Sequence, residues 1–434
     1  MGLNETPRAN QLHITLLGKR NSGKSSLINA ITGQDIALVS PHPGTTADPV
    51  YKSMEIHPLG PCVLIDTAGF DDEGELGFLR VEKTKETLAK TDIAILLLSP
   101  GGLDYEKRWI AELKKKNIPF VPVINKGDLS QGQLPTIQAD AFGAEWNAIK
   151  ELCGKEPLQI SAKTGKGIED LKKMLMESFK GSFEKESITG HLVEKGDLVL
   201  LVMPQDLQAP KGRLILPQVQ TIRDLLDRQC VVVSCTTQLL TRTLETLAEE
   251  PKLMITDSQA FKEVYEKKPE SSLLTSFSVL FAEYKGDVKT FIEGAGAIDK
   301  LTEQSKVLIA EACTHAPLSE DIGRVKIPAM LRKKYGENLT IDMVSGSDFP
   351  KELKGYDLII HCGACMFNRQ HVLSRIAAAK EQGIAITNYG IVMAKLVGIS
   401  AKTLARIEKA ESGITVNKLL VLADALGVSV DKLL

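Results

Sequence analysis

The sequence lacks any apolar run of the roughly 20 residues that a membrane-spanning helix needs, and its first residues lack the basic-then-apolar pattern of a secretory signal. We therefore expect a cytoplasmic protein without membrane contacts. The sequence also lacks an excess of charge of either sign, since 53 Lys and Arg residues balance 55 Asp and Glu residues. This balance excludes a whole-chain field that would attract nucleic acid.

Cysteines are few and odd in number, seven in 434 residues, which argues against a disulfide framework and favours burial or metal binding. Four of them lie in or beside apolar runs or have no partner motif, and we expect these to be buried. They are Cys62, Cys153, Cys230 and Cys235.

The alternation of short apolar runs with longer amphipathic stretches predicts an α/β protein of roughly two to four domains. For residues 1–180, this pattern predicts a parallel sheet covered by helices and followed by a linker. For residues 181–249, it predicts a smaller α/β unit. A second alternating block extends over residues 250–399, and a helical tail occupies residues 400–434.

A glycine-rich motif, GKRNSGKS, spans Gly18–Ser25 between a predicted strand and a predicted helix. It fits GxxxxGK(S/T), in which glycines let backbone N–H groups approach phosphates and the helix dipole adds attraction. Lys24 would contact the β- and γ-phosphates, and Ser25 would bind Mg2+. The alternative is a glycine-rich turn without nucleotide, and the motifs that follow argue against it.

Three further motifs follow predicted strands in the order expected of a GTPase. Asp66–Gly69 (DTAG) would place a carboxylate near the water shell of the magnesium and an N–H near the γ-phosphate. In Asn125–Asp128 (NKGD), Asp128 can accept hydrogen bonds from N1–H and N2–H2 of guanine, which adenine does not offer. Ser161–Lys163 (SAK) can meet the guanine O6. The sequence therefore predicts GTP and GDP as ligands.

Between the first two motifs, Thr46, or alternatively Thr45, would supply a mobile ligand to Mg2+. We expect Lys24, Thr46 and Gly69 to act in GTP hydrolysis. Phe70 stands where Ras-like enzymes carry the water-orienting Gln, so we expect slow intrinsic turnover, with the acidic residues after it as candidates for positioning water. The predicted nucleotide-binding residues are Gly18, Asn21, Ser22, Gly23, Lys24, Ser25, Ser26, Asp66, Gly69, Asn125, Lys126, Asp128, Ser161, Ala162 and Lys163.

The spelling of these motifs resembles the TrmE/Era-like branch of GTPases. In potassium-dependent members of that branch, an Asn inside the glycine-rich loop holds a monovalent cation against the phosphates, and Asn21 matches that position. The resemblance implies that K+ replaces an arginine finger and stimulates hydrolysis.

A second constellation follows two later predicted strands of similar apolar spelling. Cys313-Thr-His315 ends one strand, and His361-Cys362-Gly-Ala-Cys365 ends the other. Because the carboxyl ends of neighbouring parallel strands meet at one edge of a sheet, three thiolates and two imidazoles could converge there. Three cysteines with one histidine suit structural zinc, whereas three cysteines with a replaceable fourth ligand suit a 4Fe-4S cluster. The spacing alone does not choose between these metals.

The segments around these cysteines resemble the HydF family of FeFe-hydrogenase maturation GTPases. The match rests on APKGRLILPQ, TDSQAF, TSFS, YKGD, EACTH, DIGRVKIP, HCGACMFNR and TNYG, and it covers about residues 10 to 399. The resemblance implies a GTPase domain, a dimerisation domain and a cluster-binding domain, and hence a homodimer. It also implies that Cys313, Cys362 and Cys365 hold a 4Fe-4S cluster. His361 or His315 would be its fourth ligand, or a neighbour that orients a ligand by hydrogen bonding.

The same resemblance implies the role of a scaffold or carrier. The diiron subcluster precursor would be assembled on it with the help of two radical-SAM maturases and then delivered to apo FeFe-hydrogenase. An alternative from another class is a ribosome- or tRNA-directed GTPase with a structural zinc site. The nucleotide motifs do not separate these two functions, whereas the metal does.

Two further regions bear on partners. Lys211 and Arg213 lie in a segment that could form a dimer surface, as the resemblance implies, or could be a basic exposed loop. Residues 400–434 resemble the later helices of a repressor-type helix-turn-helix, with Lys402 and Arg406 in the recognition helix. Acidic residues in this tail weaken phosphate attraction, so we expect a packing or dimerising role rather than DNA binding. A DNA-binding regulator with GTP as its signal is the remaining alternative.

Overall fold

The computed structural model of the chain describes residues 6–33, 49–69, 74–98, 104–126, 147, 150–183, 187–204, 214–257, 260–312 and 322–396. The chain divides into two compact units, 1–185 and 186–434. Within the described ranges, no helix is both long and apolar enough to cross a membrane.

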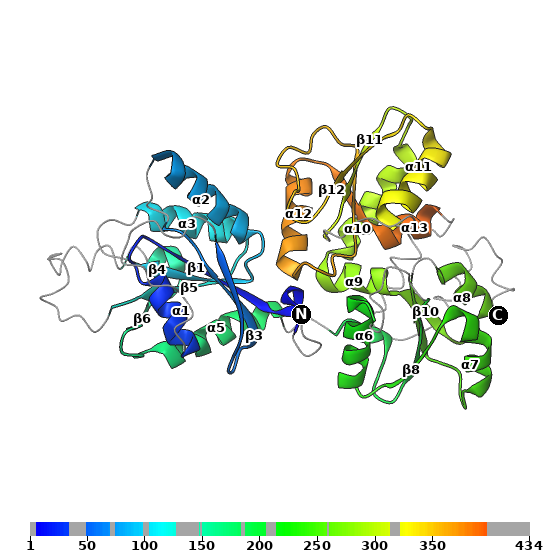
Figure 1. Cartoon of the computed structure of the whole chain (residues 1–434), viewed down its shortest axis with the longest axis horizontal. Helices are drawn as coiled ribbons and strands as arrows, with labels where there is room; N and C mark the ends of the chain where they lie inside the picture. The colour runs from blue at the N-terminus through cyan, green and yellow to red at the C-terminus, as the bar shows by residue number, and fades with distance from the viewer. Residues whose placement is uncertain are drawn as a thin grey trace, which may run out of the picture. The chain divides into compact units, whose positions relative to one another are not determined.

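The first unit is built on a six-stranded sheet with strand order β2-β3-β1-β4-β5-β6 (Figure 1). β2 runs antiparallel to β3, and the other neighbouring strands are parallel. The strands are β1 (Leu12–Gly18), β2 (Val50–Ile56), β3 (Gly60–Asp66), β4 (Ile93–Leu98), β5 (Phe120–Ile124) and β6 (Leu158–Gln159). The described helices are η1 (Arg8–Asn10), α1 (Lys24–Thr32), α2 (Gly74–Leu88), α3 (Asp104–Lys115) and α5 (Ile168–Phe183). The parallel α/β fold predicted for this part is confirmed.

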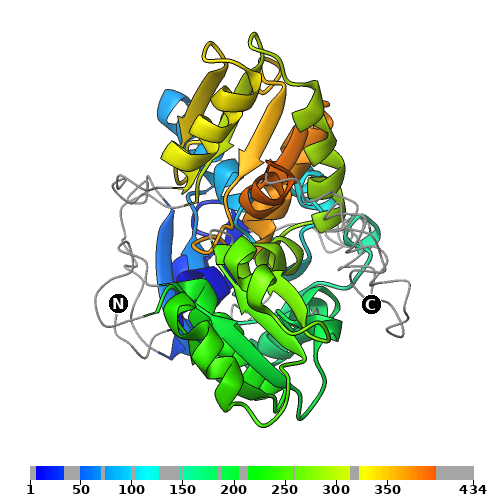
Figure 2. The same ribbon diagram turned by 90° about the vertical axis from the view of Figure 1, so that its right-hand side faces the viewer.

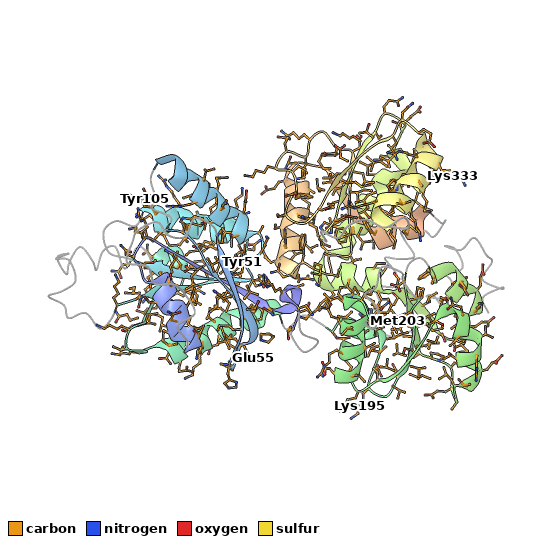
Figure 3. The ribbon with its side chains drawn as sticks, in the orientation of Figure 1. Tyr51, Glu55, Tyr105, Lys195, Met203 and Lys333 are labelled. Carbon is orange, nitrogen blue, oxygen red and sulfur yellow. The ribbon has the colours of Figure 1, made fainter. Side chains whose placement is uncertain are left out.

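Both faces of this sheet are buried. Along β4, Ile93 and Ile95 pack into a core with α1 and α5, whereas Ala94 and Leu96 pack into a core with α3. The edge strand β2 carries exposed side chains, among them Glu55 (Figure 3). The continuous apolar runs of the sequence are therefore strands covered on both sides, and the polar chemistry is left to the strand ends.

The second unit contains two four-stranded sheets, each with parallel neighbours. The second sheet of the chain has the order β10-β9-β7-β8, and the third has the order β12-β11-β13-β14. The strands are β7 (Leu198–Val202), β8 (Val231–Cys235), β9 (Leu253–Thr256), β10 (Leu273–Ser276), β11 (Lys306–Ala310), β12 (Thr340–Val344), β13 (Leu358–His361) and β14 (Ala385–Asn388).

The helices of this unit fall into two groups along the chain. Those that accompany the second sheet are η2 (Gly190–Leu192), α6 (Leu216–Asp227), η3 (Thr237–Leu239), α7 (Leu240–Thr246), α8 (Phe261–Lys267) and α9 (Phe277–Lys285). Those that accompany the third sheet are α10 (Val288–Ala295), η5 (Gly296–Lys300), the π-helix η6 (Ile322–Lys326), α11 (Ile327–Tyr335), α12 (Arg369–Glu381) and α13 (Tyr389–Leu396). The further α/β architecture expected after the first sheet is therefore present.

The strand Leu253–Thr256 corrects one expectation from the sequence. The sequence predicts that a new domain begins at residue 250 and that this strand belongs to it, but β9 lies between β7 and β10 in the second sheet. A short, fully buried apolar strand carries no mark of the sheet that it joins. The second sheet therefore extends past the expected boundary at 249, as far as Ser276 in β10.

Helix α9 belongs to two hydrophobic cores. Phe277, Leu280 and Phe281 pack into the core of the second sheet, and Val279 and Ala282 pack into the core of the third. Figures 1 and 2 show this helix between the two sheets. Ser276 caps the helix, because its Oγ accepts a hydrogen bond from the backbone N–H of Val279 at 3.4 Å. A single capped helix therefore joins the two sheets of this unit.

Phe281→Ala should lower the free energy of unfolding of this unit by about 3–5 kcal/mol, because it removes a buried ring from the core of the second sheet. Leu239→Ala is the matched control, since Leu239 is exposed, and it should change stability by less than about 0.5 kcal/mol. Urea denaturation of the full chain, followed by circular dichroism, measures both effects. An effect of Phe281→Ala no larger than that of the control would contradict the core assignment.

Candidate functional site

The glycine-rich motif forms the turn between β1 and α1, as the sequence predicts. Gly23 has a φ of 93°, in the left-handed region that favours glycine. A Cβ at this position would collide with the side-chain amide nitrogen of Asn125. At Gly18, a Cβ would lie 2.6 Å from Oγ of Ser22. The loop therefore leaves no room for a side chain at either position.

The groups predicted to bind phosphate and magnesium lie together at the mouth of this loop. Lys24 Nζ donates to the carbonyl oxygens of Gly18 (2.9 Å) and Lys19 (2.8 Å). Ser25 Oγ donates to Asp66 Oδ2 at 2.7 Å, which joins the start of α1 to the end of β3. Asp66 Oδ1 is buried and has no hydrogen-bond partner among the described residues. A hydroxyl beside a buried carboxylate with an open oxygen suits a hard cation such as Mg2+.

Burial raises the pKa of the Asp66 carboxyl, and the hydrogen bond from Ser25 and the charge of Lys24 oppose that shift. A cation bound beside Asp66 would favour its charged form in the same direction as Lys24. The buried carboxylate thus favours cation binding at the carboxyl end of β3.

Asn125 connects the loops predicted to surround the base. Its Nδ2 donates to the carbonyl oxygen of Ser22 at 3.2 Å, and its Oδ1 accepts from the backbone N–H of Ala162 at 2.9 Å. Ser161 is buried, and its Oγ accepts from the backbone N–H of Thr164 at 3.2 Å. One amide therefore fixes the glycine-rich loop against the loop after β6.

The remaining residues predicted for the nucleotide site differ in their burial and in whether the structure describes them. Ser26 lies in the first turn of α1, Gly69 is buried three residues beyond β3, and Lys126 and Lys163 are exposed. Asn21 is exposed within the loop, with a φ of 56°. The calls on three other predicted positions, Thr46, Phe70 and Asp128, lie outside the described residues.

The sequence does not predict one contact of this loop. Lys19 Nζ lies 3.3 Å from Oε1 of Glu106, which is fully buried on α3. Glu106 occurs in the first turn of a strongly amphipathic helix, where an acidic residue needs no explanation beyond the helix dipole. Nothing in the spacing connects it to the loop, so this ion pair is visible only in the folded chain.

The second predicted site lies where β11 and β13 end side by side. Ala310 pairs with His361 in the sheet, and the backbone N–H of Cys362 donates to the Ala310 carbonyl at 3.0 Å. Cys362 Sγ accepts hydrogen bonds from the backbone N–H groups of Ala312 (3.0 Å) and Ala364 (3.4 Å). The expected meeting of two strand ends is confirmed. Cys313 directly follows Ala312 in the chain, but Cys313 and His315 lie outside the described residues.

Cys362 and Cys365 lie on one turn, and this turn curves around the sulfur of Cys362. Ala364 has a φ of 52°, which bends the chain so that its N–H points at Cys362 Sγ. As a thiol, Cys362 has a pKa raised to about 11 by burial and by the nearby Cys365. The two N–H donors and Arg375 favour the thiolate instead. Backbone donors aimed at a cysteine sulfur also occur around iron–sulfur ligands, where they tune the cluster.

His361 has both ring nitrogens engaged. Its Nε2 lies 3.1 Å from Arg375 Nη1, and its Nδ1 lies 2.8 Å from the carbonyl oxygen of Cys362. A guanidinium only donates, so Nε2 accepts and Nδ1–H donates to the cysteine carbonyl. Burial and Arg375 lower the pKa of His361 to about 3, so the ring is neutral. In this arrangement His361 orients the cysteine loop, the second of the two roles expected for it.

Arg375 is itself held in place by aromatic rings. Its guanidinium carbon lies 4.8 Å from the ring centre of Phe349 and 4.6 Å from that of Phe367. It is buried, and it also donates to the carbonyl oxygen of Gly346. Sequence reasoning does not predict this residue, because Arg375 lies in the middle of α12 and belongs to no motif.

A lysine from another helix holds the same loop. Lys285 Nζ, at the end of α9, donates to the carbonyl oxygens of Ala364 (3.4 Å), Cys365 (3.2 Å) and Phe367 (2.8 Å). Its side chain is buried. Burial lowers the pKa of Lys285 to about 8, and thiolates at Cys365 and Cys362 would oppose that shift.

Four matches to protein-family models cover most of the chain. A model described as hydrogen maturase F dimerization domain matches residues 188–286, and one described as hydrogen maturase F tetramerization domain matches residues 289–406. The chain belongs to the HydF family. Residues 13–126 match a 50S ribosome-binding GTPase model, and residues 391–433 match a helix-turn-helix model. The ribosome- or tRNA-directed alternative does not account for the HydF matches. The two HydF domains indicate a homo-oligomer.

The first unit of this HydF protein is a P-loop GTPase domain related to that of MnmE. The tRNA modification GTPase MnmE of Endomicrobium trichonymphae is 37% identical over 166 residues, which are 37% of this chain and 34% of that protein. MnmE of Chromobacterium violaceum is 36% identical over 168 residues, 38% of this chain and 34% of that protein. The chain spans about a third of the length of these relatives. Era of Aquifex aeolicus bound to GDP·AlF4− covers 52% of this chain and 92% of its own at 20% identity, with a TM-score of 0.34.

Three of the HydF motifs converge on Glu311. Arg324 (DIGRVKIP) donates to its carboxylate from Nε at 2.9 Å, and Tyr389 (TNYG) donates from its hydroxyl at 3.3 Å. Glu311 itself comes two residues before Cys313 (EACTH), and a Cβ at Gly323 would collide with the Tyr389 hydroxyl. The Glu311–Arg324 ion pair therefore joins the two ends of the segment that carries Cys313 and His315.

The four cysteines expected to have no metal role pack into or against the cores of the first and second sheets. Cys62, Cys153 and Cys230 are buried as expected, and Cys235 on β8 is half-buried. Burial raises the pKa of Cys62 to about 12 and that of Cys153 to about 11. Cys62 Sγ donates to the carbonyl oxygen of Gly60 and Cys230 Sγ donates to that of Glu194, so both are thiols in the described structure.

Asn125→Ala should weaken GDP binding by about 2–3 kcal/mol, or roughly 30- to 150-fold, because it leaves the Ser22 carbonyl and the Ala162 N–H without partners. Asn338→Ala is the matched control, since Asn338 bonds to Glu303 in the second unit. Titration of a fluorescent GDP analogue measures both variants. Unchanged affinity in Asn125→Ala would contradict its role in joining the two loops.

Proposed function

We propose that this HydF protein is a GTPase scaffold that carries a 4Fe-4S cluster on Cys313, Cys362 and Cys365. On this cluster it would assemble or deliver the diiron subcluster precursor to apo FeFe-hydrogenase. The observation that carries the proposal is the contact between Ala312 N–H and the sulfur of Cys362, because Cys313 is the next residue in the chain. The covalent connection of Cys313 to Ala312 therefore supports a common metal group for Cys313 and Cys362.

The donor set fits a cluster with one replaceable ligand. Cys362 and Cys365 share one tight turn, and their loop is fixed by His361 and Lys285 through backbone carbonyls. Both nitrogens of His361 are engaged, which supports three protein thiolates with a fourth position left to another ligand. When bound, a cluster of this kind supplies an iron that can accept a bridging ligand from a second metal fragment. His361 and Lys285 hold that loop in place through its backbone carbonyls.

The GTPase domain would act alongside this site in the cytoplasm, with two radical-SAM maturases and the apo-hydrogenase as partners. In that domain Lys24 would contact the phosphates. Ser25 and Thr46, the mobile ligand expected from the sequence, would bind Mg2+. The pairing of Ser25 with the buried Asp66 supports the magnesium site.

Dimerisation would use the free edge of the second sheet. β8 is an edge strand, and Val231 on it is 53% exposed. On the neighbouring helix α6, Val219 is 47% and Leu226 is 54% exposed, two helical turns apart on one face. An edge strand beside an exposed apolar helix face supports pairing with a second copy of the chain. Lys211 and Arg213, which the sequence proposes for this surface, lie outside the described residues.

Metal analysis with EPR on anaerobically reconstituted protein tests the cluster. We expect about four irons per chain and a reducible signal. Changing Cys313, Cys362 and Cys365 together to Ala should abolish both, because the thiolate ligands are gone. Cys235→Ala, the matched control, should retain both. Stoichiometric zinc without iron after attempted reconstitution would instead favour a structural zinc site.

Potassium should speed GTP turnover through Asn21, whose exposed position in the glycine-rich loop leaves its amide accessible. We expect about tenfold faster hydrolysis in KCl than in NaCl at equal ionic strength, which corresponds to about 1.4 kcal/mol of barrier. Asn21→Ala should lose this difference while still binding GDP. Equal turnover of the unmodified protein in the two salts would contradict stimulation of hydrolysis by K+.

A further inference from the structure

Lys285 is a buried cation whose hydrogen-bond partners in the described structure are neutral. Its side chain is only 2% exposed, and Nζ lies within 3.4 Å of three carbonyl oxygens, those of Ala364, Cys365 and Phe367. The centre of the Phe281 ring lies 5.7 Å from Nζ. Three acceptors match the three N–H donors of an ammonium group, whereas a neutral amine has only two. The geometry therefore suits the charged form.

The charge lies beside the cysteine loop rather than at the surface. Lys285 bonds to the carbonyl of Cys365 itself and to that of Ala364, whose N–H is directed at Cys362 Sγ. Two arginines also lie near the loop. Arg324 is paired with Glu311, and Arg375 contacts His361 and the ring of Phe367.

We propose that Lys285 is a positioning residue of the cluster site, which anchors the 362–367 loop to helix α9 and raises the reduction potential of the cluster through its positive charge. The inference rests on the proposed function, since it needs a cluster on these cysteines. Reduction adds an electron to a group already surrounded by thiolates. A nearby cation in a site with little water stabilises that added charge, because screening is weak there.

The anchoring and the charge can be separated by substitution. Lys285→Met keeps an unbranched chain but removes the donors and the charge. Lys285→Gln removes the charge but keeps an amide with two N–H donors, one fewer than the ammonium group has. Lys285→Arg keeps the charge and the donors. Lys380→Met is the matched control, because Lys380 lies in the same unit but is exposed and pairs with Asp287.

An EPR-monitored redox titration of the reconstituted full chain tests the inference. We expect the midpoint potential to become more negative in Lys285→Met and Lys285→Gln, and to stay at the value of the unmodified protein in Lys285→Arg and Lys380→Met. Circular dichroism and gel filtration establish that each variant is folded. If Lys285→Met binds no cluster, Lys285→Gln and Lys285→Arg carry the comparison.

The outcomes separate the two proposals. Absence of a cluster in the unmodified protein would remove the proposed function itself. A cluster whose potential is the same in Lys285→Gln as in the unmodified protein would overturn the role of Lys285 and leave the proposed function standing. An equal negative shift in Lys285→Arg and Lys285→Met would also overturn it, because the charge would then not be the cause. Loss of the cluster in the Met and Gln variants, with retention in the Arg variant, supports the inference.

Discussion

Parallel strands that end at one edge of a sheet are the constraint on which both sites depend. In the first unit the edge gathers the turn after β1, Asp66 at the end of β3, and Asn125 after β5. In the third sheet it brings the residues after β11 against the sulfur of Cys362, which follows β13. Segments far apart in sequence therefore meet without any special contact, because the pairing of the strands already aligns their ends.

Sequence reasoning succeeded where chemistry follows strand ends, and it failed where it depends on side chains that arrive from helices. The glycine-rich loop and the meeting of the two cysteine segments could be predicted, because motif residues and strand pattern are both local. Glu106, Lys285 and Arg375 could not, since each reaches its site across the space between two elements. The sequence predicts the wrong sheet for the strand Leu253–Thr256 for a related reason, because an apolar strand buried on both sides has no feature that identifies its neighbours.

Buried cations held by backbone carbonyls recur in both units, with different consequences. Lys24 bonds to the carbonyls of Gly18 and Lys19 in a loop of the phosphate-binding type. A bound anionic ligand could therefore pair with its charge. Lys285 bonds to carbonyls of the turn that carries Cys362 and Cys365. Similar local geometry therefore suits two different uses. Lys24 would bind an anion that enters and leaves, whereas Lys285 would keep a permanent positive charge beside the cysteine turn.

Helix α9 packs into the cores on both sides of the boundary between the two HydF domain models. The two parts are therefore separate in sequence but do not fold as separate units. The two matches divide after residue 286, just past this helix, yet Val279 and Ala282 complete the core that follows. A fragment beginning at residue 289 would lack part of its own interior and the lysine at its cysteine turn. The two sheets should consequently be inherited, exchanged and lost together, and recombination at the apparent domain junction would produce a chain with an unfilled core.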